Sequence, residues 1–226
     1  MRKLTMFNKI VGITNKTIKH PDYPECLDSL DLKWIEFLIN SKLFPVSLCT
    51  IPPKYVDTQI QSLNIKGIIL SGGHTPSNKA FKMTKKYSSI KNNFIRRDLY
   101  EISLVNKCIK RKLPVLGVCR GLQLLNIYFG GKLTRLNGHD GKGKHKITKY
   151  AKNSSTSFAR TVNSYHNYGV KINNLGSSLI PLAFDNEGNI EAFKHKKKKI
   201  MGIMWHPERE INFKKNDFIL FEEFFK

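Results

Sequence analysis

Short apolar runs and amphipathic segments alternate along the first half of the chain. Runs that are apolar throughout are typical of strands buried on both faces, whereas apolar residues at helical spacing indicate helices that pack on a sheet. The predicted strands are 9–14, 44–48, 65–70 and 115–118, and the predicted helices are 28–39, 94–111 and a segment starting just after residue 119. The polar segments 15–25 and 78–93 are predicted to be loops. This alternation predicts a mostly parallel sheet.

The pattern changes at residue 146, where short segments of alternating polar and apolar residues begin. Such segments are typical of antiparallel strands. They are predicted at 146–150, 158–162, 179–183, 190–193 and 200–204, with the lysine-rich run 195–199 as the turn of a hairpin. A chain of 226 residues is long enough to bury a sizeable core. We therefore expect a single α/β domain over residues 1–226, with an open, mostly parallel central sheet flanked by helices and a small antiparallel extension.

The chain is strongly basic, with a formal net charge of +22 from 39 Lys and Arg and 17 Asp and Glu residues. Only eight of the basic residues are arginine, and the lysines are scattered along the chain. Either a solvated surface or attraction to an anionic partner explains this composition. No recognised nucleic-acid-binding motif accompanies the charge, so nucleic acid is not the expected partner, and an anionic small substrate stays open beside a solvated surface.

Four cysteines lie far apart without a Cys-x-x-Cys pair, which argues against a disulfide scaffold and against a zinc site. The basic N-terminal segment lacks the apolar core of a signal peptide, and no apolar run reaches membrane-spanning length. We therefore expect a cytoplasmic protein without a membrane partner. No feature of the sequence fixes an oligomeric state.

The most informative stretch joins the apolar strand 115–118 to the helix that follows it. Gly117-Val-Cys-Arg-Gly121 places a cysteine in a tight strand–turn–helix connection, with a glycine two positions away on either side. Such a nucleophile elbow exposes its central side chain and needs small neighbours, because the strand and helix backbones approach closely. The helix amides behind the sulfur also favour a thiolate. A buried structural cysteine is the alternative, and we interpret Cys119 as the nucleophile.

A pair of glycines follows the apolar strand 65–70 and would lie at the same edge of a parallel sheet. Paired glycines at the carboxyl end of a buried strand let the backbone approach a ligand. Backbone amides of Gly73 and Arg120 are therefore the predicted oxyanion hole.

The segment Trp205-His-Pro-Glu208 ends another predicted strand. Residues i and i+2 of an extended chain project to the same side, so Glu208 can orient the ring of His206. The other ring nitrogen is then free to take the proton of Cys119. His166 is a rival base, but it has no carboxylate nearby in the sequence. We therefore predict a Cys119–His206–Glu208 triad and assign the predicted turn 163–167 to substrate binding.

Two further groups of charged residues are interpreted as solvated surface. The glycine- and lysine-rich segment 139–146 is expected to be a loop, with no metal site from His139, Asp140 and His145. Phosphate contacts are the other role considered for this loop, through Lys142 and Lys144. At the start of helix 94–111, surface ion pairs are expected from Arg97, Asp98 and Glu101.

Taken together, these motifs resemble the class I glutamine amidotransferases. The elbow Cys119-Arg-Gly-Leu-Gln123 and the terminal His206-Pro-Glu208 carry that resemblance. Further motifs are similar to the γ-glutamyl-γ-aminobutyrate hydrolase type of the peptidase C26 family: Arg97-Asp98 with Glu101, Gly130-Gly131, Asn163-Ser-Tyr-His166 and Trp205-His-Pro-Glu208. The resemblance covers residues 9 to 225. It implies a flavodoxin-like open α/β fold with the site at the strand ends.

The resemblance implies a hydrolase that cleaves a linear γ-glutamyl amide bond. Cys119 would attack the γ-carbonyl carbon, His206 would act as base and acid while Glu208 orients it, and water would hydrolyse the resulting thioester to release glutamate. The glutamyl amino and carboxylate groups would be held by Gln123, Asn163, Ser164, Tyr165 and His166. Neither a metal nor an organic cofactor is implied.

Asn167 and Tyr168 stand where this family often has His and Gln, on the leaving-group side. The compact, basic chain is similar to family members that hydrolyse a γ-glutamyl-CDP-amidate in capsule phosphoramidate synthesis, which implies a nucleotide-linked conjugate as substrate. Two alternatives stay open. One is a glutaminase subunit that passes ammonia to a synthetase partner, and the other is a non-catalytic basic binding protein on the same scaffold.

Overall fold

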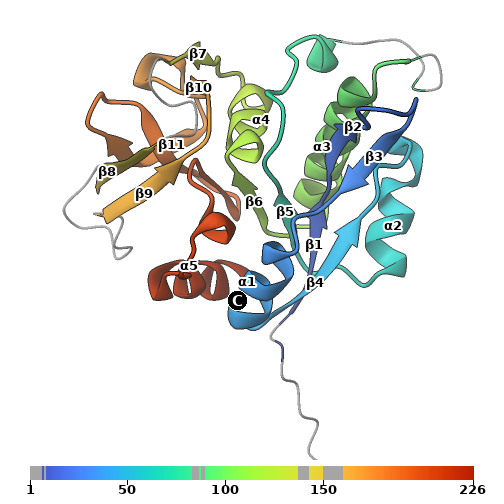
Figure 1. The fold of residues 1–226 in the computed structure, drawn as a ribbon, viewed down its shortest axis with the longest axis horizontal. Helices are drawn as coiled ribbons and strands as arrows, with labels where there is room; N and C mark the ends of the chain where they lie inside the picture. The colour runs from blue at the N-terminus through green and yellow to red at the C-terminus, as the bar shows by residue number, and fades with distance from the viewer. Residues whose placement is uncertain (1–6, 8, 83–86, 88–89, 137–142, 150–159) are drawn as a thin grey trace, which may run out of the picture.

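The computed structural model describes residues 7, 9–82, 87, 90–136, 143–149 and 160–226. A nine-stranded sheet runs through these residues (Figure 1). Its strands are β1 (Lys9–Thr14), β4 (Leu43–Leu48), β5 (Ile68–Leu70), β6 (Val115–Val118), β8 (Gly143–Lys149), β9 (Arg160–Ser164), β11 (Leu179–Asp185), β12 (Ile190–His195) and β13 (Ile200–Ile203). Their order across the sheet is β4-β1-β5-β6-β13-β12-β11-β8-β9.

The sheet has a parallel half and an antiparallel half that meet at β13. Strands β4, β1, β5, β6 and β13 all pair in parallel. From β13 onward each neighbouring pair is antiparallel, through β12, β11, β8 and β9. This confirms the predicted fold class, a mostly parallel central sheet with antiparallel strands added at one end. The predicted hairpin turn of lysines lies between β12 and β13.

Five α-helices accompany the sheet in the described part of the chain: α1 (Lys33–Asn40), α2 (Val56–Ser62), α3 (Asn93–Lys110), α4 (Arg120–Tyr128) and α5 (Lys215–Phe225). Figure 1 shows α1 and α5 together beside the C-terminus. Their apolar faces meet through aromatic rings, with the centroids of Phe37 and Phe221 4.8 Å apart. None of the described helices is long and apolar enough to span a membrane.

The predicted loop 15–25 is partly wrong, because a small hairpin forms there. Its strands are β2 (Lys16–Lys19) and β3 (Cys26–Ser29). The hairpin is mostly polar and exposed, so it lacks the apolar alternation that marks a strand. Asp28 lies in β3, where its carboxylate accepts from the backbone N–H of Thr50 at 2.6 Å, so helix α1 begins at Lys33 rather than at residue 28.

Other element boundaries also differ from the predictions. The short polar helix α2 was not expected from the sequence. Strand β8 begins at Gly143, inside the predicted loop 139–146, and residues 137–142 lie outside the described residues. Strand β9 continues to Ser164, so Asn163 and Ser164 are extended rather than part of a turn. Two short strands, β7 (Thr134–Arg135) and β10 (Tyr168–Gly169), pair with each other.

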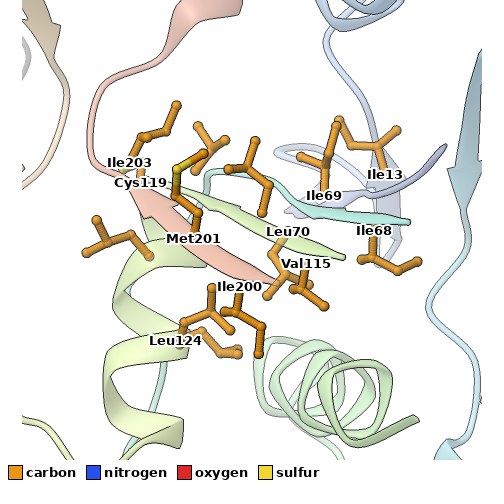
Figure 2. Packing of buried hydrophobic residues seen from close by; sticks show 14 of the residues in the cluster. Ile13, Ile68, Ile69, Leu70, Val115, Cys119, Leu124, Ile200, Met201 and Ile203 are labelled. Atoms are coloured by element: carbon orange, nitrogen blue, oxygen red, sulfur yellow. The ribbon is translucent and has the colours of Figure 1, made fainter. Parts of the chain in front are cut away.

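The apolar core forms around the central parallel strands. Every residue of β5, β6 and β13 is buried, as the continuous apolar runs predict. Cys108 of α3 is also buried in this core. Figure 2 shows Cys119 close to Ile203, where β6 and β13 end, above the aliphatic side chains of the sheet. The core therefore supports Cys119 at the carboxyl edge of the parallel strands.

Candidate active site

Cys119 lies at the sharp turn between β6 and α4, with φ 50° and ψ −101°. Non-glycine residues rarely adopt a positive φ, and strain of this kind is expected at a nucleophile elbow. The flanking glycines have no room for a side chain. A Cβ on Gly117 would collide with the backbone of Gly121, and one on Gly121 would collide with the carbonyl of Leu70. The backbone N–H of Cys119 donates to the carbonyl of Ile203 at 2.8 Å, which ties the turn to β13.

His206 and Glu208 follow strand β13, which pairs in parallel with β6. The Nδ1 atom of His206 lies 2.7 Å from Oε1 of Glu208, and both side chains are buried. The ring of His206 is also in hydrogen-bond contact with the side chain of Cys119. A carboxylate on one ring nitrogen fixes the tautomer and leaves the other nitrogen for the thiol. The structure thus brings the three residues of the predicted triad together.

The surroundings of His206 favour its protonated form. Burial lowers the pKa of this imidazole, but the charges of Glu208 and of the Cys119 thiolate, with their hydrogen bonds, raise it more strongly. The pKa is raised from its ordinary value of 6.5 to about 9. An imidazolium beside a thiolate supplies both a nucleophile and the acid that a leaving nitrogen requires.

The segment after β5 closes the site from another side. A Cβ on Gly72 would run into the ring of His206, and Gly73 adopts a φ of 143°, in a region that favours glycine. Gly73 and Cys119 line the same pocket. Arg120 is the first residue of α4, and the first amides of a helix have no partner within the helix. The oxyanion hole formed by the amides of Gly73 and Arg120 stays a prediction.

The expectation of surface ion pairs at Arg97, Asp98 and Glu101 is wrong, because all three side chains are buried. The guanidinium of Arg120, which is also buried, donates to both carboxylates. Arg97 donates to Glu101 at 2.9 Å and to the backbone carbonyls of residues 71 and 72, each at 3.1 Å. Two cations and two anions balance each other in this network, which offsets the cost of burying charge. It holds the glycine segment against the start of α4.

Asn163 was predicted to bind substrate, but its side-chain amide holds the backbone of His206. Its Nδ2 donates to the carbonyl of His206 at 2.8 Å, and its Oδ1 accepts from the N–H of His206 at 2.8 Å. Nδ2 also donates to Glu210 at 3.0 Å. Glu210 in turn pairs with Lys144, at 2.9 Å, so that lysine has a carboxylate partner in this structure. These hydrogen bonds from Asn163 of β9 fix the position of the His206 backbone.

A pocket of about 330 Å³ opens from Cys119 to solvent. Besides Cys119 and His206 it is lined by residues 16–18 of β2, Gly73, His74, Tyr165 and Arg209. The ring of Tyr165 meets that of His206 edge-on, with centroids 5.7 Å apart and an interplanar angle of 85°. The guanidinium of Arg209 lies over the Tyr165 ring, 4.8 Å from its centroid. Sequence reasoning had not singled out Lys16, Thr17 or Arg209 as site residues.

The remaining predicted substrate-binding residues lie beside the pocket rather than on its lining. Gln123 donates from Nε2 to the carbonyl of Tyr168 at 2.7 Å, and Nδ1 of His166 lies 3.2 Å from the same oxygen. Ser164 is buried in β9. His166 does have a carboxylate close by, since its Nε2 lies 3.7 Å from Glu191 of β12. His166 and Glu191 are brought together by the order of strands in the sheet, and no local sequence pattern indicates that they are close.

One group of side chains in the described part of the chain has the residue types and spacing of a metal site. Ligand atoms of His145, Asp185 and Glu191 lie within 4.8 Å of one another. The Asp185 carboxylate already accepts from the backbone and side chain of Asn189, each at 2.8 Å. A hydrogen bond to Glu191 raises the pKa of His145. Hydrogen bonds thus account for this cluster, and the candidates His139, Asp140 and Lys142 lie outside the described residues.

Comparison with known proteins agrees with this geometry. The family model for peptidase C26 matches residues 9–208. The chain belongs to the peptidase C26 family. This match includes both the cysteine elbow and the His-Pro-Glu segment, and it agrees with the expected family resemblance.

Two proteins that are similar to this chain have names that describe γ-glutamyl or glutamine hydrolysis. The chain is 35% identical over 201 residues to a protein of Campylobacter jejuni named gamma-glutamyl-CDP-amidate hydrolase, and the alignment covers 88% of this chain and 90% of that protein. It is 30% identical to a subunit of the glutamine-hydrolysing GMP synthase of Methanococcus vannielii, over 64% of this chain and 65% of that relative.

A solved structure shares the fold of this peptidase C26 chain. A glutamine amidotransferase from Thermotoga maritima superimposes with a TM-score of 0.63 at 17% sequence identity, over 95% of this chain and 83% of that one. At 17% identity this similarity shows only that the two proteins share a fold.

Proposed function

We propose that this protein is a cysteine hydrolase that cleaves γ-glutamyl amides through Cys119, His206 and Glu208. The observation that carries the proposal is the alignment of these side chains: Cys119 on a strained elbow contacts His206, which lies 2.7 Å from Glu208 at the base of an open pocket. A thiolate activated by an oriented imidazole is a sufficient nucleophile for an amide carbonyl. No metal or organic cofactor is required for this chemistry.

In the first half of the reaction, the Cys119 thiolate attacks the γ-carbonyl carbon of the glutamyl amide. The developing oxyanion accepts from the backbone N–H groups of Gly73 and Arg120. As the carbon–nitrogen bond breaks, the imidazolium of His206 gives its proton to the leaving nitrogen. The product of this half-reaction is a γ-glutamyl thioester on Cys119.

In the second half, water enters the place that the leaving group has vacated. His206, now neutral, takes a proton from this water, and the hydroxide attacks the thioester carbon. Collapse of the intermediate releases glutamate and returns the sulfur as thiolate beside the imidazolium. Glu208 stays ionised throughout and keeps the ring of His206 in one orientation.

For the substrate we propose a γ-glutamyl-CDP-amidate, as an intermediate of capsule phosphoramidate biosynthesis. The name and the 35% identity of the Campylobacter relative support this choice. The formal charge of +22 supports it as well, since a nucleotide leaving group carries negative charge that a basic protein attracts.

The test is release of glutamate, measured by mass spectrometry, from glutamine, γ-glutamyl-γ-aminobutyrate and γ-glutamyl-CDP-amidate. We expect rapid release from the CDP-amidate by the wild-type protein, and loss of that release in Cys119→Ala. Cys49→Ala, which changes an exposed cysteine, is the matched control and should retain activity. Equal release by Cys119→Ala and wild type would contradict the proposal.

A glutaminase subunit is the second candidate, favoured by the similarity to the GMP synthase relative from Methanococcus. In that case glutamine would be the preferred substrate, and activity would stay low until a synthetase partner is added. The same substrate panel therefore separates the two functions.

A further inference from the structure

The Cys119 pocket carries positive charge from two different segments. Lys16 comes from β2 and Arg209 from the 3-10 helix η5 (Pro207–Arg209), and both line the pocket. No carboxylate is among the described residues that line it. Lys16 forms no ion pair with a carboxylate in the described part of the chain. Arg209 also lies 3.6 Å from the carboxylate of Glu208, which offsets part of its charge. A lysine and an arginine that line one pocket are suited to an anion, and phosphate is the anion that Lys and Arg commonly bind together.

A second cavity adjoins the first at Thr17, a buried residue that lines both. Its volume is about 410 Å³, within the range of small-molecule sites. Asp28, Thr50 and Arg96 contribute polar groups to its lining, and Tyr87 contributes an aromatic ring. The guanidinium of Arg96 lies 5.7 Å from the centroid of that ring. Planar groups and hydrogen-bonding groups together are suited to a nucleoside.

The order of atoms in the substrate matches the order of these features. In a γ-glutamyl phosphoramidate the nitrogen that leaves the γ-carbonyl carbon is bonded directly to phosphorus. A phosphate must therefore lie next to the point of attack by Cys119, where Lys16 and Arg209 stand. The nucleoside lies beyond the phosphates, and the second cavity lies beyond Thr17.

We propose that the β2–β3 hairpin forms the leaving-group subsite. Lys16 and Arg209 bind the phosphates next to the scissile nitrogen, and the cavity across Thr17, with Arg96 and Tyr87, receives the nucleoside. This inference rests on the proposed function, because it assigns the residues that would select a nucleotide-linked γ-glutamyl amide. It also gives the hairpin, which the sequence did not predict, a specific role.

The first experiment compares kcat/KM of Lys16→Ala with that of wild type. We expect Lys16→Ala to lower kcat/KM for γ-glutamyl-CDP-amidate by about 10- to 100-fold, the effect of losing one charge-assisted hydrogen bond. Lys19→Ala is the matched control, because Lys19 lies on the same strand but lines neither cavity. A much smaller loss is expected for glutamine, which has no phosphate. Equal losses on both substrates would mean that Lys16 binds the glutamyl carboxylate, and would overturn the proposal.

The nucleoside part is tested with Arg96→Ala. We expect it to lower kcat/KM for γ-glutamyl-CDP-amidate but to have little effect on γ-glutamyl phosphoramidate, which lacks the nucleoside. Equal effects on these two substrates, or none on either, would overturn this assignment.

A binding measurement separates this proposal from the proposed function. Calorimetry with CDP on the Cys119→Ala protein should give binding that Lys16→Ala weakens by about 10-fold or more. Such binding without hydrolysis by the wild type would support the subsite and contradict the proposed function. Hydrolysis of the CDP-amidate with no dependence of CDP binding on Lys16 would support the function and overturn the subsite.

Discussion

At the scale of single residues, the pKa of His206 sets the pH range in which the site can work. Its value of about 9 comes from burial, which lowers it, and from Glu208 and Cys119, which raise it more. The proposed mechanism needs the imidazolium as an acid. We therefore expect kcat/KM of the wild-type protein to fall as the pH rises through about 9.

Glu208→Gln removes the carboxylate that raises this pKa. We expect a decrease in kcat of about 10²- to 10⁴-fold near neutral pH, because a neutral amide neither stabilises the imidazolium nor fixes the tautomer. The fall of kcat/KM at high pH should also move to lower pH, and pH–rate profiles of both proteins measure it. Glu223→Gln, on the surface of α5, is the control. An unchanged profile in Glu208→Gln would contradict this role of Glu208.

The same shift links His206 to folding stability. A pKa raised in the folded state contributes stability that is fully present below the unfolded value of 6.5 and is lost as the pH rises through about 9. Between these two pH values, the urea midpoint of the wild type should therefore decrease more than that of Glu208→Gln. Parallel changes in both proteins would contradict the linkage.

Substitution of Asn163 can distinguish two roles. One is to position His206, and the other is the direct substrate binding that the sequence predicted. Because its side chain holds both backbone polar groups of His206, Asn163→Ala should lower kcat by about 10- to 100-fold with little change in KM. Asn173→Ala, which changes an exposed amide that does not line the Cys119 pocket, is the control. A large rise in KM at constant kcat would instead support direct contact of Asn163 with substrate.

At the scale of elements, the strand–turn–helix unit β6–α4 determines where the nucleophile stands. The sequence predicts this unit well, because a short apolar run, two glycines and a helical apolar pattern are all local signals. The hairpin β2–β3 was missed, since a polar hairpin has no such signal. The buried ion pairs of Arg97 and Arg120 were missed for another reason. Arg97 pairs with Glu101 within α3, but Arg120, which pairs with Asp98 and Glu101, comes from α4, so α3 taken alone looks like a surface helix.

The close packing at the elbow predicts that adding a single methyl group at Gly121 destabilises the fold. In Gly121→Ala the added Cβ would collide with the carbonyl of Leu70, and neither the strand nor the helix can move freely. We expect destabilisation by about 1–3 kcal/mol in urea unfolding, with a loss of activity because Cys119 is displaced. Gly143→Ala is the matched control, since a Cβ there meets no atom within 4 Å. Equal stability of the two variants would contradict the close packing at the elbow.

At the scale of the whole molecule, the nine-stranded sheet brings together residues from its parallel half and its antiparallel half. Cys119 comes from the parallel half, and Asn163 comes from the antiparallel edge strand β9. The fold class and the members of the triad were predictable, because each belongs to a local motif at a strand end. The partners of His166 and Asn163 were not, because they depend on the order of strands in the sheet.

The net charge of +22 predicts a dependence on ionic strength at this scale. Electrostatic attraction of an anionic substrate weakens as salt shortens the Debye length, to about 10 Å at 0.1 M. We expect kcat/KM for γ-glutamyl-CDP-amidate to fall several-fold as salt is added, whereas that for glutamine, which has no net charge, changes little. The same salt response for both substrates would contradict a role of the basic surface in substrate capture.

The central claim is that Cys119 forms a γ-glutamyl thioester, and its most direct test is to detect that intermediate. Wild-type protein mixed with a γ-glutamyl substrate, quenched in acid within one turnover and digested, should carry a γ-glutamyl group on the peptide that contains Cys119. Cys119→Ala should carry none, and Cys49→Ala should be labelled like the wild type. Glutamate release without an acyl group on Cys119, or with the group on another residue, would contradict the account.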